Sequence, residues 1–239
     1  MARFVYNLKP GEGSMKHVIH FLVCIFMALP LLPQKSHALS EQQELLDEAR
    51  ITFDKLIASP EFAELPRYVK NARALMIFPD VFKGGFGLGG EGGSGILVVR
   101  NLQDKNWSQP AFYTLFSGSL GLQVGVQISE VIFTIMNDNA LNAILDNQVK
   151  FGAGISVAVG PIGKGLGSNT TTNFDADVYS FAKTSGLFGG ISFEGSGIVK
   201  KDSYNHAYYD SKATPYAIVI ENRYNNPNTR ILLNALAPY

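Results

Sequence analysis

Apolar residues recur every three or four positions over residues 40–58, which predicts an amphipathic helix. Ser40 stands where it can cap the start of this helix, with Gln43 at the capping-box position, and Ser59-Pro60 ends it. The predicted buried stripe comprises Leu45, Leu46, Ala49, Phe53, Leu56 and Ile57. A second short helix is predicted from Pro60 to Ala74, with inward side chains at Phe62, Leu65, Tyr68, Val69 and Ala72.

Further along the chain the apolar period changes from 3.6 to 2. Over residues 117–129 and 151–160, apolar side chains alternate with small or polar ones, as in strands with one buried face. Additional strands are predicted at 130–136, 175–183 and 186–195, so that about six strands are expected in all. Helices are predicted at 138–147, 215–222 and 230–237, and Thr214-Pro215 would open the second of them. The polar stretch 200–210 is predicted to be a turn or strand edge, and residues 225–228 a turn.

A glycine-rich stretch, KGGFGLGGEGGSGILVVR, occupies residues 83–100. A dinucleotide-binding loop would have to open a helix, but Ile96–Val99 has the composition of a strand. Gly163-Lys164 lacks the flanking residues of a phosphate-binding P-loop. We therefore interpret residues 83–100 as a bent, glycine-faced strand pair, because glycine permits sharp coiling and close approach of neighbouring backbones.

Together these patterns predict an α+β fold. We expect a strongly curved, Gly-rich antiparallel β-sheet or partial barrel, flanked by N-terminal and C-terminal helices. No linker composition interrupts residues 39–239, which are predicted to form a single domain.

The first 38 residues have the layout of a secretory signal peptide. Lys16 precedes an apolar run, Val18–Leu32, and Ser36-His37-Ala38 resembles a small-x-small cleavage site. We expect cleavage after Ala38, translation that can begin at Met15, and an exported protein in the periplasm or cell envelope. A retained N-terminal anchor is the alternative. The mature chain would hold no cysteine, because Cys24 lies in the apolar run.

Charge and residue types argue against most chemistry. The full chain has a formal net charge of zero, which disfavours a nucleic-acid binder. His206 would be the single histidine of the mature chain, so neither a catalytic triad nor a zinc or copper site is expected. Asp175 and Asp177 share a strand face, but two solvated carboxylates explain them without catalysis. No cofactor, metal site or catalytic residue is predicted, and the protein is not expected to be an enzyme.

A basic surface is the stronger functional signal. Arg67, Lys70 and Arg73 are spaced three apart, which on a helix places them on one broad face, and Lys83 follows in sequence. With apolar neighbours such as Phe62, this is the kind of patch that contacts anionic lipid headgroups. An ordinary solvated helix face is the alternative, since Glu61 and Glu64 are close by.

Four glycine-patterned motifs resemble the SYLF domain family, a lipid-binding domain also catalogued as the actin-binding domain of fungal actin regulators. They lie in order at residues 78–100, 117–138, 157–165 and 185–198, and the similarity runs from about residue 42 to 222. The resemblance implies a bacterial, exported, non-enzymatic member of the family. It also implies lipid contacts at Lys55, Arg67, Lys70, Arg73 and Lys83. One departure from the family pattern is that residues 41–54 are mainly acidic, with Arg50 as their one basic residue.

Three functional hypotheses follow. The first is a peripheral protein that binds anionic phospholipid or phosphoinositide-type headgroups; nucleic acid is not a predicted partner, and actin is disfavoured by the export signal. The second is a structural or protein-interaction module of the cell envelope. The third is a small outer-membrane barrel, which needs at least eight strands where about six are predicted. The identity of the lipid, the leaflet and the oligomeric state are left open.

Overall fold

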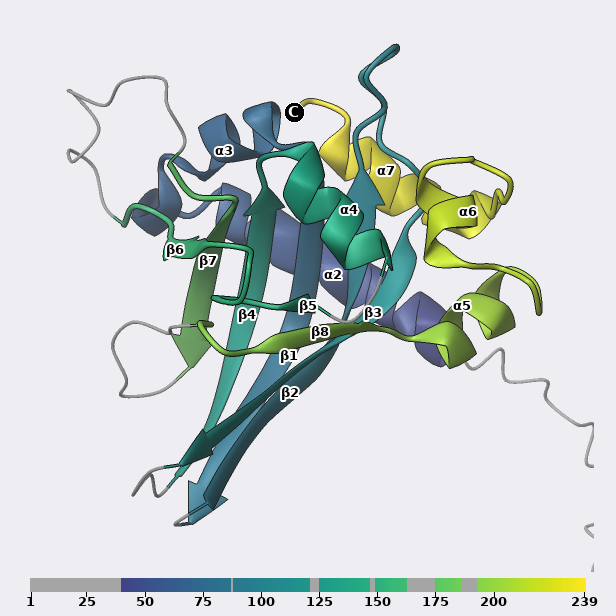
Figure 1. The fold of residues 1–239 in the computed structure, drawn as a ribbon. Coiled ribbons are helices and arrows are strands. Elements are labelled where there is room, and N and C mark those ends of the chain that lie inside the picture. Colours follow the sequence, from purple (N-terminus) through teal and green to yellow (C-terminus); the bar gives the residue numbers. More distant parts are fainter. Residues whose placement is uncertain (1–39, 87, 121–124, 147–148, 163–174, 186–192) are drawn as a thin grey trace, which may run out of the picture. The chain divides into compact units, whose positions relative to one another are not determined.

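The computed structural model describes residues 40–86, 88–120, 125–146, 149–162, 175–185 and 193–239 (Figure 1). All of them belong to one compact unit, Leu39–Tyr239. Its helical elements are α2 (Glu41–Ile57), η1 (Pro60–Phe62), α3 (Leu65–Asn71), α4 (Asp138–Asp146), α5 (Asp202–Tyr208), α6 (Pro215–Val219), η2 (Pro227–Thr229) and α7 (Arg230–Leu236). Its strands are β1 (Ala74–Phe86), β2 (Leu88–Val99), β3 (Ala111–Leu120), β4 (Gly125–Ile135), β5 (Val149–Lys150), β6 (Val157–Val159), β7 (Val178–Ser185) and β8 (Gly197–Lys200).

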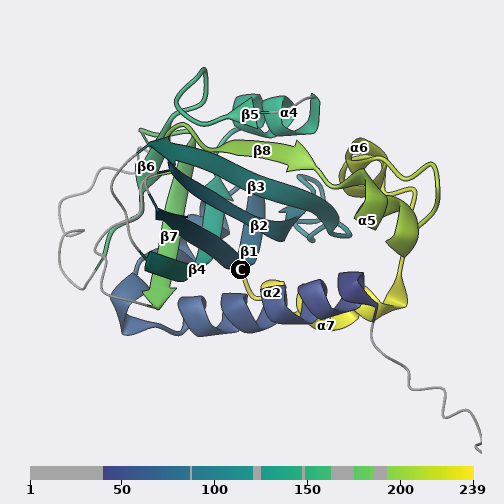
Figure 2. The ribbon, with the colours of Figure 1, turned by 90° about the horizontal axis from the view of Figure 1, so that it is seen from below.

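The described strands form one eight-stranded sheet in the order β5-β8-β3-β2-β1-β4-β7-β6. Every neighbouring pair is antiparallel except β6–β7, which is parallel. The sheet curls into a half-barrel, with helices contributed by both ends of the unit (Figures 1 and 2). The predicted α+β class and curved, mainly antiparallel sheet are therefore confirmed.

Alternation along the strands separates two hydrophobic cores. We call one side of the sheet the α4 face; it carries Met76, Phe78 and Phe133, packed with residues of α4. The opposite α2 face carries Leu75, Ile77 and Ile132, which pack beneath α2, α3 and α7 (Figure 2). Because adjacent residues of β1 enter different cores, its first half, from Ala74 to Phe78, is apolar and is buried on both sides.

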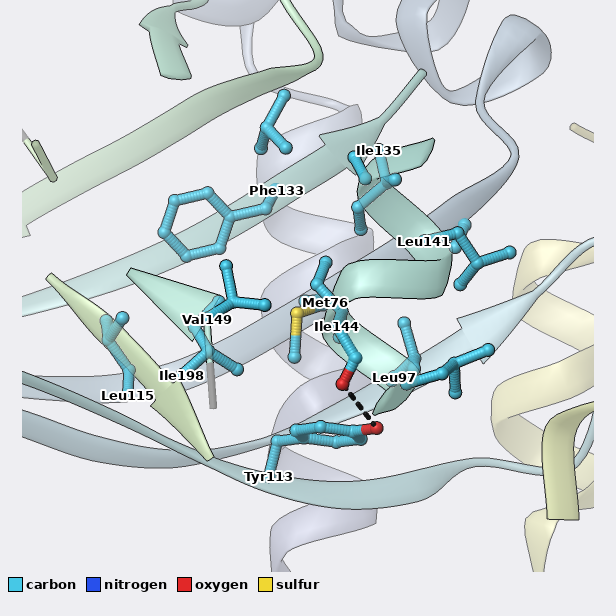
Figure 3. Close-up of a cluster of buried hydrophobic side chains, with 14 of the residues drawn as sticks. Met76, Leu97, Tyr113, Leu115, Phe133, Ile135, Leu141, Ile144, Val149 and Ile198 are labelled. Atoms are coloured by element: carbon cyan, nitrogen blue, oxygen red, sulfur yellow. Dashed lines mark hydrogen bonds between the residues drawn. The ribbon is translucent and has the colours of Figure 1, made fainter. Parts of the chain in front are cut away.

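The α4-face core is shown in Figure 3. Tyr113 is fully buried in it, and its hydroxyl donates to the main-chain oxygen of Ile144 at 3.5 Å. Burial raises the pKa of this phenol well above its usual range. Tyr113 therefore stays protonated and acts as a packed, hydrogen-bonded core residue.

The first helix forms as its sequence pattern predicts. The Ser40 hydroxyl accepts a hydrogen bond from the main-chain N–H of Gln43 at 3.3 Å. Ala49, Phe53 and Leu56 are fully buried against the α2 face. Each large apolar side chain so buried contributes roughly 1.5–3 kcal/mol to folding, which holds α2 on the sheet.

The bent glycine-rich strand pair is confirmed as the β1–β2 hairpin, although residue 87 at its tip lies outside the described residues. A β-bulge interrupts β1 between Phe78 and Val81. Opposite the bulge on β2, a Cβ atom at Gly93 would collide with the main-chain oxygen of Asp80. Glycine at position 93 thus lets the bulged strand lie against its neighbour.

Several predicted element boundaries were wrong. Residues 117–129 are not one strand but the end of β3 and the start of β4, with 121–124 outside the described residues. Odd-numbered positions face α4 in both β3 and β4. The alternation of apolar and small residues therefore has the same phase in the two strands, which made them resemble one strand in the sequence. Residues 151–160 contain only the short strand β6, and of 186–195 only 193–195 are described, without a strand.

The sheet has eight described strands where about six were expected, since β5 and β8 are too short to show a period. The polar stretch 200–210 contains helix α5 and not a turn or strand edge. Helix α6 begins after its Thr214 cap as predicted but ends at Val219. None of the helices in the described ranges combines the length and apolar character needed to cross a bilayer.

Candidate functional site

The predicted second helix is divided in two, and this changes the geometry of the basic residues. Pro60–Phe62 forms a 3₁₀ turn, and α3 ends at Asn71. Arg67 and Lys70 lie on α3, whereas Arg73 lies beyond its end, in a bend that leads into β1. The prediction that the three cations share a helix face is wrong for Arg73, because the chain must leave the helix to enter the sheet.

Arg67 and Lys70 both lie at the surface, Arg67 partly exposed and Lys70 exposed. The guanidinium of Arg67 is 3.6 Å from Glu64, a loose contact between two partly exposed side chains. Lys70 is exposed and makes no ion pair with any residue in the described ranges. Exposed pairs such as Arg67–Glu64 contribute about 0–1 kcal/mol to stability.

The other predicted cations have intramolecular roles. Lys55 lies 2.5 Å from Glu130 of β4 and so pairs the end of α2 with the sheet. Arg73 donates to Asp138 at 2.6 Å and also to the main-chain oxygen of Arg100.

Lys83 lies on β1 past the bulge, 4.0 Å from Glu91, whose side chain is only 5% exposed. Burial raises the pKa of Glu91, and the nearby ammonium of Lys83 partly offsets this. Arg73 and Lys83 stand near opposite ends of β1, roughly 30 Å apart at the strand rise per residue. The five predicted cations therefore do not form one patch.

A buried arginine that the sequence patterns did not reveal organises the α3 end of the unit. The Arg100 guanidinium donates to the main-chain oxygens of Val69 at 2.9 Å, Ala72 at 3.2 Å and Tyr239 at 2.9 Å. It also lies 4.0 Å from the centre of the Trp107 ring. Burial, and secondarily the charge of Arg73, lowers its pKa. Its position after the apolar run ILVV is the one local signal that could have drawn attention to it.

Arg100 also anchors the connection between β2 and β3. Its guanidinium donates to the main-chain oxygen of Lys105 at 3.4 Å, and Lys105 has a left-handed φ of 64°. In the same connection Leu102 is 56% exposed. In the view of Figure 1, this connection and α3 both lie in the upper part of the unit. We call Arg67, Lys70, Leu102 and Lys105 the α3 surface.

The residues weighed for chemistry have structural explanations. The Asp177 carboxylate accepts from the main-chain N–H of Ser156 at 2.8 Å, its hydroxyl at 2.7 Å and the Asn137 amide at 2.7 Å. These hydrogen bonds, the Ser156 N–H first, lower its pKa and hold the β6–β7 edge together. Asp175 is exposed near the start of β7, and His206 is exposed on α5. In the described ranges no three His, Cys, Asp or Glu side chains gather as metal ligands.

Comparison with known proteins adds a family match. The family model named Ysc84, described as "Las17-binding protein actin regulator", matches residues 116–239, just over half of the chain. The human SH3 domain-containing YSC84-like protein 1 is 32% identical over 152 residues, which cover 63% of this chain and 44% of the relative.

Two relatives from Saccharomyces cerevisiae show similar values. Protein YSC84 is 31% identical over 159 residues, or 65% of this chain and 34% of the relative. LAS seventeen-binding protein 3 is 29% identical over 157 residues, or 64% of this chain and 34% of the relative. The chain thus spans less than half the length of these curated relatives.

Proposed function

The chain belongs to the Ysc84, or SYLF, family, and on that premise we propose that it is a non-enzymatic peripheral membrane protein that binds anionic phospholipid headgroups. The α3 surface is the observation that carries the proposal. It presents the exposed Lys70, which makes no intramolecular ion pair in the described ranges, Arg67, which lies 3.6 Å from Glu64, and the exposed Lys105 and Leu102 of the β2–β3 connection.

Electrostatics and apolar contact act together on this surface. A basic residue close to an anionic membrane contributes about 1 kcal/mol, and that contribution falls off within a Debye length. Arg67, Lys70 and Lys105 would supply most of the attraction, and Leu102 would add a small apolar contact with the acyl boundary. Because Arg100 hydrogen-bonds to both segments, α3 and the β2–β3 connection would meet the membrane as one rigid surface.

The first helix is poorly suited to membrane insertion. Its apolar stripe is buried on the sheet, and its first turns carry Glu41, Glu44 and Glu48. Exposing Phe53 and its neighbours to lipid would remove them from a core in which they are fully buried. We therefore assign the membrane contact to α3 and the β2–β3 connection, with Lys55 and Arg73 supporting the fold through their ion pairs.

Vesicle co-sedimentation tests the proposal. The purified protein is expected to sediment with phosphatidylglycerol-containing vesicles, not with phosphatidylcholine alone, and to dissociate as salt rises. The triple variant R67Q/K70Q/K105Q is expected to lose most of this binding. A matched variant, K150Q/K212Q/R230Q, removes the same charge from exposed positions elsewhere and should retain it. Equal loss in both variants, or no sedimentation with any anionic vesicle at low salt, would refute the assignment.

The family description supports a second candidate, a protein-interaction module. The matching model is described as an actin regulator, so actin filaments belong in the same sedimentation assay. The expectation that actin is not a partner stays a prediction, as does export to the periplasm or cell envelope. Amino-terminal sequencing of the protein from the cell envelope tests the latter, with residue 39 as the expected first residue.

A further inference from the structure

A second surface of different chemistry lies on the α2 face. A groove of about 390 Å³ separates the first turns of α2 from the bulged part of β1. Carboxylates line it at Glu41, Glu44 and Glu48 on α2 and at Asp80 on β1, and its apolar lining includes Leu45 and Phe82. Figure 2 shows α2 lying along this face of the sheet.

The groove arises because α2 does not cover the whole sheet. The bulge places Asp80 at the groove, while Phe82, on the same face, is 51% exposed. Gly93 and Ser94 of β2 also line it without adding bulk. An aromatic ring left half exposed beside carboxylates is a surface where an aliphatic stem with a charged end can lie.

One end of the groove already holds a cation from this chain. The Lys201 ammonium donates to the Ser94 hydroxyl at 2.7 Å and lies 3.4 Å from the centre of the Tyr204 ring. The Tyr204 hydroxyl in turn donates to Glu41 at 2.9 Å. A hydroxyl, an aromatic face and a neighbouring carboxylate thus form a working ammonium site at one end.

The rest of the groove has an excess of negative charge. Glu44, Glu48 and Asp80 make no ion pair with any residue in the described ranges. Glu44 and Glu48 are four residues apart on one helix, a spacing at which like charges repel. Burial, then the charges of Asp80 and Glu44, raises the pKa of Glu48. A second cation would relieve this crowding.

We propose that the groove binds a cationic peptide segment of a partner protein, with a Lys or Arg side chain placed among Glu44, Glu48 and Asp80. The aliphatic stem of that side chain would lie on the Phe82 ring. This arrangement would resemble the site at the other end of the groove, where the Lys201 ammonium lies over the Tyr204 ring. The same negative charge disfavours an anionic membrane, so this groove and the α3 surface recognise different partners. The proposal does not depend on membrane binding.

Fluorescence polarisation with a labelled Ala-Arg-Ala-Arg-Ala-Arg peptide tests the groove, with an Ala-Glu repeat as the negative probe. The protein is expected to bind the cationic peptide at low salt. The variant E44Q/E48Q/D80N should bind it at least about tenfold more weakly, because three attractive charges are lost at short range. A matched variant, E61Q/D146N/D175N, removes three exposed carboxylates elsewhere and should change the affinity less than about twofold.

A single variant, Phe82→Ser, guards against misfolding of the triple variant. Phe82 is half exposed, so the change should lower the melting temperature only slightly while weakening peptide binding about threefold. Equal losses in the groove and matched variants, or no binding of the cationic probe, would overturn the proposal. Binding seen only after removal of residues 1–38 would assign the groove to the chain's own N-terminal segment and overturn it as well.

Discussion

Replacing Arg100 by Met is predicted to destabilise the unit more than any exposed charge substitution. The guanidinium is buried and donates three hydrogen bonds of 3.2 Å or shorter, to the main-chain oxygens of Val69, Ala72 and Tyr239. Met preserves much of the side-chain volume and the contact with Trp107 but donates none of these bonds. The variant therefore measures how much the polar interactions of the Arg100 guanidinium contribute to the stability of the unit.

The magnitude follows from the contacts. A hydrogen bond from a charged donor contributes about 1.5–3 kcal/mol, and the cation–π contact with Trp107 about 0.5–2 kcal/mol. Burial of the charge opposes these gains, as the lowered pKa of Arg100 shows. Because the substitution leaves main-chain acceptors without their donor, we expect a net loss of about 3 kcal/mol. Arg100→Lys should cost about 2 kcal/mol, since an ammonium cannot reproduce the planar fork.

Urea denaturation followed by circular dichroism measures this loss. At an m-value of about 2 kcal/mol/M, the midpoint should fall by roughly 1.5 M with the slope unchanged. Arg223→Met, at an exposed pair with Glu221, should change stability by less than about 0.5 kcal/mol. A loss below about 1 kcal/mol for Arg100→Met would refute the conclusion that this arginine holds α3 to the sheet.

Two further predictions concern the sheet. Gly93→Ala would place a Cβ against the main-chain oxygen of Asp80, so we expect about 2–3 kcal/mol of destabilisation in the same urea assay; a neutral result would mean that the bulge is not constrained there. Hydrogen bonds from Ser156 and Asn137 depress the pKa of Asp177, so its contribution is present above the unfolded pKa of about 3.9 and is lost as pH falls through the lower folded pKa. Asp177→Asn should therefore flatten the acid limb of a melting-temperature profile, and an unchanged limb would contradict this.

Local patterns predicted the elements whose geometry depends on near neighbours. Helix α2 has its predicted start and buried stripe because the 3.6-residue period and the Ser40 cap act within one segment. The glycine-rich hairpin was recognised because a strand with glycine on one face can coil. The short strands β5 and β8 were missed since two or four residues display no period. Arg100 was missed because its partners lie on other elements.

The sequence by itself determined the α+β class, the curved glycine-rich sheet and the lack of a recognisable catalytic motif. Only the tertiary structure decided which charges are available. The extended backbone of β1 separates Arg73, just before the strand, from Lys83, near its other end, and helix docking pairs Lys55 with Glu130. The bulge brings Asp80 to the acidic turns of α2. Periodicity reports the burial of a residue within its own element, whereas a surface depends on contacts between residues far apart in the chain.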